Sequence, residues 1–307
     1  MLKQQIISKA KQLGFNLLGF AKYEILENEI ENLEKWLSMN YQAGMNYMQM
    51  NIDKRKDVEK ILPNCKSVIS LGVNYFVDKK FDEINNSGKV SRYAWGKDYH
   101  LIIWEKLNEL IEFAKTVEPN FEAKSYVDTG PVMDKVWAIK SGLGWQGKHS
   151  NIINKEIGSW FFIATIITNY DFKEYNNPIL DLCGTCTACI NACPTNAIVQ
   201  DYVVDSNKCI SYLTIENKGE ISDIFVGKFN NWIFGCDICQ EVCPWNKKFA
   251  EQTNVLEFQN IQNKTIAFCE IENMENSEFK KRFESSPILR SKLKGLKRNS
   301  EFLQKKN

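Results

Sequence analysis

Eight of the ten cysteines fall in two runs whose spacing is typical of iron–sulfur proteins. The first run reads C-x2-C-x2-C-x3-C-P over residues 183–194, the spacing of bacterial ferredoxins with two 4Fe–4S clusters. The second run is a stretched copy, in which Cys209 stands alone and C-x2-C-x3-C-P follows at residues 236–244. In such ferredoxins the cysteine before the proline binds the neighbouring cluster. The spacing therefore predicts two ligand sets: Cys183, Cys186, Cys189 and Cys243 for one cluster, and Cys193, Cys209, Cys236 and Cys239 for the other.

Zinc and disulfides are the alternative uses of so many cysteines. A structural zinc site takes four ligands, commonly two C-x2-C pairs, which accounts poorly for eight cysteines with two C-P endings. Cys65 and Cys269 lie beside apolar runs and are expected to be buried bystanders. The N-terminus lacks an apolar leader and no stretch is long enough to span a membrane, so we expect a cytoplasmic protein whose cysteines stay reduced.

The elements that position these cysteines are of mixed type. Apolar spacing predicts a helix over residues 99–117, and buried or alternating runs predict strands at 68–76, 121–127 and 160–168. We expect an α+β protein with three parts. Residues 1–172 form a mixed α/β catalytic domain, residues 173–250 a ferredoxin-like module, and residues 251–307 a basic helical tail.

Asp128 is the best candidate for proton chemistry, because it ends a predicted strand and precedes Thr-Gly-Pro. Burial there would raise its pKa and keep a proton available near neutral pH. The alternative is ordinary helix capping by the same carboxylate. Asp134 is a second candidate acid, although its helical position beside Lys135 suits an exposed site. The chain has only two histidines, His100 and His149, which are too few for a His-based metal site.

Positive charge is concentrated at the end of the chain. The whole chain has a net charge of +1, whereas residues 280–307 hold ten Lys or Arg against two Glu, a local balance of +8. A solvated helix face is the plain interpretation. Contact with a phosphate backbone is the interpretation that we favour, with Lys292, Lys294, Lys297 and Arg298 as the candidate contacts.

Several motifs together resemble the epoxyqueuosine reductases, iron–sulfur and cobalamin enzymes of tRNA modification, along nearly the whole chain. The cysteine spacing alone is generic, but its combination with the residues around Cys209 and Cys243 is specific to that family. The matching stretches are RYAWGKDYH at 92–100, VDTGP at 127–131, GLGWQGK at 142–148, CISYLTIE at 209–216, GCDICQEVCPWN at 235–246 and GLKRN at 295–299.

The resemblance implies that a cobalamin lies between the first domain and the cluster module, and that epoxyqueuosine at the tRNA wobble position is reduced to queuosine. It assigns Asp128 as the proton donor. With two histidines, we expect no histidine ligand to cobalt. By position, the candidate cobalamin contacts are Lys148, His149, Ser150, Asn151, Ser211, Tyr212, Gly235 and Asp237. For Ser211, a backbone cap is the alternative role.

Two other functions share these features. A reductive dehalogenase-like enzyme would use the same cofactors, but such enzymes typically carry a twin-arginine signal, which this sequence lacks. A two-cluster electron carrier would need neither cobalamin nor Asp128. Many relatives continue past the GLKRN stretch into helical repeats, so we interpret this chain as a short form in which the basic tail does more of the tRNA binding. We expect a monomer that receives electrons from a separate donor.

Overall fold

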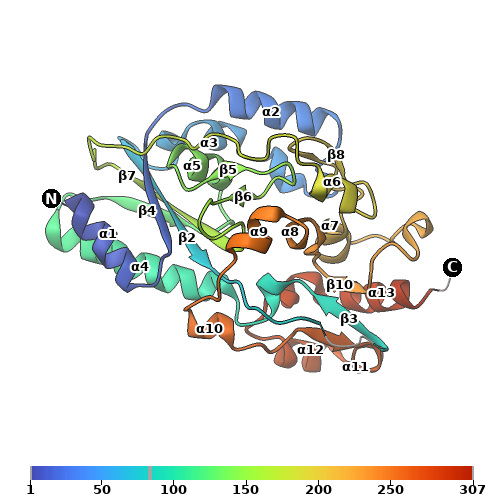
Figure 1. Ribbon diagram of the computed structural model, residues 1–307. Helices are drawn as coiled ribbons and strands as arrows, with labels where there is room; N and C mark the ends of the chain where they lie inside the picture. The colour runs from blue at the N-terminus through green and yellow to red at the C-terminus, as the bar shows by residue number, and fades with distance from the viewer. Residues whose placement is uncertain (1, 82–84, 306–307) are drawn as a thin grey trace.

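The computed structural model describes residues 2–81 and 85–305, and a four-stranded antiparallel sheet forms its centre (Figure 1). The strand order is β1-β2-β7-β4, so β2 and β7 are the inner strands. Every residue of β2 is buried, because helices cover both faces of the sheet. The strands are β1 (Leu17–Lys22), β2 (Ser67–Asn74), β4 (Ala123–Tyr126) and β7 (Phe161–Thr168).

Alternation along the strands sends neighbouring side chains to opposite faces. Ile69 and Ile166 pack against α1 (Leu2–Gln12) and α4 (Tyr99–Val117), the helix that the sequence predicted with the same bounds. Val68 and Ile167 belong to the core on the other face, covered by three further helices. Those helices are α2 (Glu27–Ser38), α3 (Ile52–Lys56) and α5 (Asp134–Lys140).

The cluster module consists of short elements that place cysteines at helix ends. Cys193 follows the last residue of α6, while Cys209 and Cys243 precede the first residues of α7 and α9. Helices α6 and α8, which follow the two ligand-rich loops, pack against each other. The elements are α6 (Ala188–Ala192), β8 (Ile198–Gln200), β9 (Val203–Val204), α7 (Ile210–Ile215), α8 (Ile238–Glu241) and α9 (Pro244–Phe249).

A second sheet takes one strand from each predicted part of the chain. Its order is β10-β3-β11, with β10 parallel and β11 antiparallel to β3. The segments therefore share one core, and the tail contains a strand in addition to helices. These strands are β3 (Ser87–Val90), β10 (Trp232–Phe234) and β11 (Thr265–Ala267); the tail helices are α10 (Leu256–Gln259), α11 (Phe268–Glu272), α12 (Asn276–Arg282) and α13 (Lys292–Gln304).

A small hairpin of β5 (Trp145–Gln146) and β6 (Ile152–Ile153) presents the loop at residues 147–151. Gly144 is required beside it, since a Cβ there would lie 2.2 Å from the Ile153 carbonyl oxygen. Five 3-10 helices complete the described elements. They are η1 (Asn46–Gln49), η2 (Val58–Lys60), η3 (Arg92–Ala94), η4 (Asp223–Phe225) and η5 (Pro287–Ser291).

Candidate functional site

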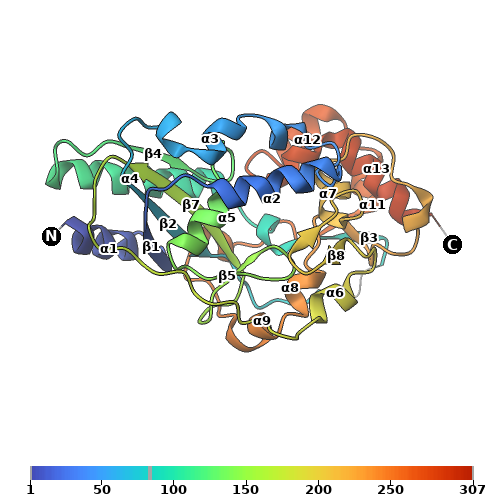
Figure 2. The same ribbon diagram turned by 90° about the horizontal axis from the view of Figure 1, so that it is seen from above.

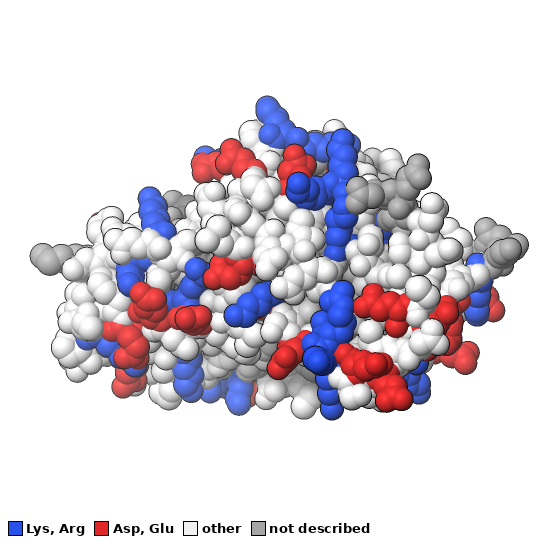
Figure 3. All heavy atoms as spheres, turned by 90° about the horizontal axis from the view of Figure 1, so that it is seen from below, with Lys and Arg blue, Asp and Glu red and all other residues white. Residues whose placement is uncertain are grey.

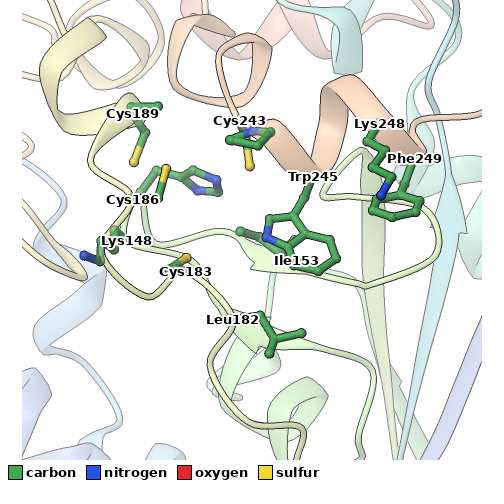
Figure 4. Close-up of a pocket in the computed structure, with 13 residues that line it drawn as sticks. Lys148, Ile153, Leu182, Cys183, Cys186, Cys189, Cys243, Trp245, Lys248 and Phe249 are labelled. Carbon is green, nitrogen blue, oxygen red and sulfur yellow. The ribbon is translucent and has the colours of Figure 1, made fainter.

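Four cysteines surround a cavity of about 360 Å³ at the outer side of the cluster module. They are Cys183, Cys186, Cys189 and Cys243, the set that the spacing predicted for one cluster, and Figure 4 shows their sulfur atoms facing a common space. All ten cysteines are free thiols. Within the described residues, no three His, Cys, Asp or Glu side chains converge on one point as a single metal ion requires. A 4Fe–4S cube fits this arrangement better, because its thiolates bind separate corners.

The cavity also offers N–H groups to an anionic cluster. His149 lines it and is 5% exposed, and its Nε2 has no hydrogen-bond partner in the part of the chain that is described. The indole of Trp145 lies beside Cys183 and lowers the pKa of that thiol, although burial raises this pKa more strongly. Both features fit a cluster whose sulfur atoms accept hydrogen bonds.

The second predicted set, called here the inner set, comprises four half-buried cysteines: Cys193, Cys209, Cys236 and Cys239. The charges of Cys193 and Cys209 both act on Cys239, as does that of Cys189 from the outer set, so the two sets are adjacent. The carboxylate of Asp237, between two cysteines of the inner set, accepts hydrogen bonds from Ser91 Oγ at 2.5 Å and Arg92 N at 2.8 Å. This carboxylate ties the inner set to the first domain.

Asp128 follows β4, and its charge acts on Lys135 together with the charges of two inner-set cysteines. Its backbone is left-handed, with φ of +55°, and its side chain is 62% exposed. The Tyr99 hydroxyl donates a hydrogen bond to Asp128 Oδ2, and His100 Nε2 lies 3.9 Å from the same oxygen. Helix α5 begins only at Asp134 and is preceded by Met133, so Asp128 does not cap it. The capping interpretation is therefore excluded, and the burial that the sequence analysis expected for Asp128 is also wrong, because the loop after β4 leaves the side chain exposed.

Lys135 lies between Asp128 and the inner cysteines. Its side chain is reached by solvent, yet protein surrounds the ammonium group, and burial lowers its pKa. The negative charges of Asp128, Cys239 and Cys209 oppose this shift. Lys135 Nζ donates to Ser150 O at 2.8 Å and Asn151 Oδ1 at 3.2 Å. The region around the Lys135 side chain, between Asp128 and the inner set, is called the cleft below.

The sequence analysis expected the Asp134 side chain to be exposed, and this expectation is wrong. The carboxylate turns inward and accepts a hydrogen bond from Thr165 Oγ1 at 2.5 Å, because the first turn of α5 packs against β7. Burial, with a smaller contribution from the nearby charge of Asp128, raises its pKa to about 7. The Thr165 hydrogen bond and the charge of Arg55 act in the opposite direction.

The predicted cofactor contacts separate into groups. Lys148 and His149 line the outer cysteine cavity, whereas Ser150 and Asn151 contact Lys135. Tyr212 receives a hydrogen bond from the Gly44 backbone at 2.8 Å, and the Ser211 carbonyl oxygen accepts one from Thr214 at 3.3 Å.

Gly235 and Asp237 lie at the buried junction with Ser91 instead of in the cleft. A Cβ on Gly235 would lie 2.5 Å from the Ser91 Cβ, so Gly235 serves close packing. The Asp237 side chain is 1% exposed. Both residues join the cluster module to the first domain.

Sequence reasoning missed a group of polar side chains near Asp128. Arg290 Nε donates to Glu216 Oε1. Burial lowers the pKa of Arg290, but Glu216 and, more weakly, Tyr47 and Asp128 raise it overall. The group comes from η1, the end of α7 and η5, which are far apart in sequence. The one sequence feature that could have indicated this group is the position of Glu216 at the end of a family motif.

The basic tail contributes fewer free charges than its sequence suggests. Arg298 is directed inward and donates to Leu213 O, Asn217 O and Gly219 O at 2.8, 2.6 and 2.8 Å. Lys297 donates to Glu272 O at 3.0 Å. Lys306 lies outside the described residues. The exposed lysines whose side chains make no hydrogen bond or ion pair with a described residue are Lys280, Lys281, Lys292 and Lys294.

The face seen in Figure 3 carries basic and acidic side chains that are interspersed, without one continuous basic surface. Across residues 2–81 and 85–305, no helix is both long and apolar enough to cross a membrane.

Two family models match the chain. Residues 182–246 match a 4Fe-4S double cluster binding domain, and residues 55–129 match a model described as epoxyqueuosine reductase QueG, DUF1730. The chain is 46% identical to the epoxyqueuosine reductase of Cellulophaga algicola over 97% of both chains. It is 47% identical to that of Leadbetterella byssophila over 98% of both chains.

Solved structures agree with these matches. A crystal structure of selenomethionine-labeled epoxyqueuosine reductase superposes with a TM-score of 0.92 at 32% identity, covering 98% of this chain and 80% of that one. A crystal structure of epoxyqueuosine reductase with a tRNA-Tyr epoxyqueuosine-modified tRNA stem loop gives a TM-score of 0.91 at 32% identity, with the same coverage.

Proposed function

This chain belongs to the epoxyqueuosine reductase family, and we infer that it reduces epoxyqueuosine to queuosine at the wobble position of tRNA. The observation that carries the inference is the likeness, over 98% of this chain, to a relative solved with an epoxyqueuosine-modified tRNA stem loop. Removing the epoxide oxygen as water consumes two electrons and two protons. A tRNA substrate favours a cytoplasmic site of action, and we propose that the chain acts as a monomer.

The protein holds two 4Fe–4S clusters and a cobalamin. The double-cluster match supports the two cysteine sets as cluster ligands. We propose that the cobalamin lies in the cleft between Asp128 and the inner set, because the Lys135 side chain is exposed there and contacts Ser150 and Asn151, two of the contacts predicted from the sequence. When bound there, cobalamin supplies the metal centre that delivers electrons to the substrate carbon. His149 faces the outer cysteine cavity, which supports our expectation that it is no cobalt ligand.

We propose that electrons pass from the outer cysteine set to the inner set and then to the cleft. Three observations support this direction. Cys189 of the outer set acts electrostatically on Cys239 of the inner set. Cys209 and Cys239 in turn act on Lys135, which lies in the cleft. Cys186 of the outer set is exposed at the surface, where electrons can enter.

Asp128 is proposed to protonate the oxygen of the opening epoxide. The Tyr99 hydroxyl donates to Oδ2, so this oxygen is held as an acceptor and Oδ1 is left to carry the transferable proton. The exposed position of the side chain allows solvent to return a proton after each turnover. A left-handed backbone at a non-glycine residue is uncommon, although Asp tolerates it better than most.

Lys292 and Lys294 are proposed to contact tRNA phosphates. They are exposed and follow directly after Arg290, which lies near Asp128. The anticodon loop can therefore reach the cleft along the start of α13. Lys297 and Arg298 were also candidates from the sequence. Both donate hydrogen bonds to main-chain carbonyls within the protein, and we propose that they mainly stabilise the fold.

The test is turnover of epoxyqueuosine-containing tRNA by anaerobically purified protein with cobalamin, measured as queuosine by mass spectrometry of digested tRNA. Asp128→Asn should lower turnover by at least about 100-fold, as expected when a general acid is lost. Its corrin and cluster absorption should match the wild type. Full turnover by Asp128→Asn would remove this residue from the mechanism, and no queuosine from the wild type would overturn the proposed function.

A further inference from the structure

The outer end of the proposed electron path lies at the molecular surface. Residues 184–187, which include Cys186, are all exposed. Gly184 has a φ of +50°, and a Cβ at this position would meet no atom within 4 Å. The loop around the outer cluster is therefore covered by no other described part of the chain, whereas the four cysteines of the inner set are all half-buried. A redox partner can approach the outer cluster directly.

Apolar groups surround this opening. Leu180 is 82% exposed and Leu182 is 44% exposed, which is unusual for leucine on a soluble surface. Leu182 lines the cavity together with Trp245 and Phe249, whose rings stack with centroids 5.4 Å apart (Figure 4). The centre of this surface is thus apolar and aromatic, as in the core of a protein interface.

The rim beside the apolar centre is basic. Lys247 and Lys248 are exposed on α9, and no described carboxylate lies within 4 Å of either ammonium group. Figure 4 shows Lys248 beside Phe249, and its Nζ lies 5.0 Å from the centroid of that ring.

Two acidic side chains lie near the opening, and one of them is paired with a lysine. Asp201 pairs with Lys148 at 2.9 Å, and Asp181 accepts hydrogen bonds from Cys183 N and the Tyr202 hydroxyl. Asp181 keeps its negative charge, since both of its hydrogen-bond donors are neutral, so the balance at this rim is two lysines against one carboxylate.

We propose that this surface, called here the donor face and defined by Leu180, Leu182, Cys186, Trp245, Lys247 and Lys248, docks a small acidic electron-carrier protein. The proposal rests on the proposed function, because that reaction consumes electrons. The reduced carrier loses one electron and a [4Fe–4S]²⁺ cluster becomes [4Fe–4S]⁺, with no bond made or broken. Two such encounters supply one turnover. Carboxylates on the carrier meet the two lysines, and its apolar surface covers the leucines.

The donor face leaves the tRNA path open. In Figure 2, α9 lies at one edge of the molecule and α12 at the opposite edge, with α13 beside α12. A carrier on α9 and an anticodon loop at the start of α13 therefore occupy different sides. Electrons can be delivered while tRNA is bound.

The test measures cluster reduction without tRNA, so its outcome is independent of queuosine formation. Protein with both clusters is mixed anaerobically with flavodoxin hydroquinone, an acidic one-electron carrier, and formation of the blue semiquinone is followed by stopped flow. The double variant Lys247→Glu/Lys248→Glu should slow this reaction by roughly 10-fold or more at low salt, because charge steering raises association rates by 10- to 1,000-fold. High salt should bring the two proteins to similar rates.

The matched control is Lys280→Glu/Lys281→Glu on α12, which changes the net charge equally and should react like the wild type. Reduction by dithionite, which needs no protein docking, should be equal in all three proteins. Leu180→Glu, at the most exposed leucine, should also slow the flavodoxin reaction. Equal rates for the α9 and α12 variants would overturn the proposal. The proposal would also be overturned if dithionite reduced the clusters of the wild-type protein and flavodoxin hydroquinone did not.

Discussion

Arg298 and the neighbouring lysines differ in role, although the sequence analysis proposed phosphate contact for all of them. Its guanidinium group donates three hydrogen bonds to main-chain carbonyls at residues 213, 217 and 219, and burial lowers its pKa. Arg298→Gln can restore at most one of them. Each lost hydrogen bond costs about 1 kcal/mol net, and a carbonyl left unpaired and buried adds about 1 kcal/mol more. We therefore expect the free energy of unfolding to fall by about 3 kcal/mol.

The assay compares Arg298→Gln with Lys292→Gln and Lys294→Gln, which remove exposed charges. A loss of about 3 kcal/mol corresponds to a thermal midpoint lower by at least about 5 °C in a chain of this size. The lysine variants should keep the wild-type midpoint. They should weaken tRNA binding. The slope of the logarithm of the binding constant against the logarithm of the salt concentration should become shallower by about 0.7 per lost contact, the value for single strands.

The opposite pattern would refute this reasoning. If Arg298→Gln melts like the wild type and weakens tRNA binding as strongly as Lys292→Gln, the guanidinium group serves tRNA and not the fold. Tight binding of tRNA by both lysine variants would remove the start of α13 from the tRNA interface.

Two further predictions concern buried polar groups. His149→Phe removes an N–H group from the outer cavity at nearly constant volume, so the reduction potential of the outer cluster should fall while that of the inner cluster stays unchanged, measured by EPR-monitored redox titration. Asp134 has its pKa raised from 3.8 to about 7, so the folded state holds the extra proton between these values, and stability falls as pH rises through this range. The full shift corresponds to about 4 kcal/mol, and partial solvent access reduces this to roughly 2 kcal/mol. Asp134→Asn should therefore melt several degrees above the wild type at about pH 8, and this advantage should shrink at about pH 5; a constant difference would contradict the assigned burial.

Local patterns predicted well those features that depend on neighbouring residues. The apolar spacing of residues 99–117 gave α4 its observed bounds, and the predicted strand at 68–76 corresponds to β2. The cysteine spacing grouped Cys183, Cys186, Cys189 and Cys243, and these four line one cavity in the structure; their role as cluster ligands stays a prediction. The family inferred from the motifs is confirmed by relatives at 46% and 47% identity.

Features that depend on distant partners were not predictable. The burial of Asp134 depends on Thr165 in β7, and the inward direction of Arg298 depends on carbonyls more than 75 residues earlier. The sheet of β3, β10 and β11 joins three parts of the chain through strands of four residues or fewer, which are too short to show a period. The sequence analysis therefore separated parts that the structure packs into one core.

The loop at residues 147–151 connects the two halves of the proposed electron path. Lys148 and His149 line the outer cavity, and the next two residues accept hydrogen bonds from Lys135 in the cleft. The loop is held at both ends by the β5–β6 hairpin, and Ser150 has a left-handed backbone with φ of +68°. A shift of this loop toward one side therefore moves contacts on the other side as well. Because of this coupling, substitutions at Lys148 should change the hydrogen bonds between the loop and Lys135, even though Lys148 itself lines the outer cavity.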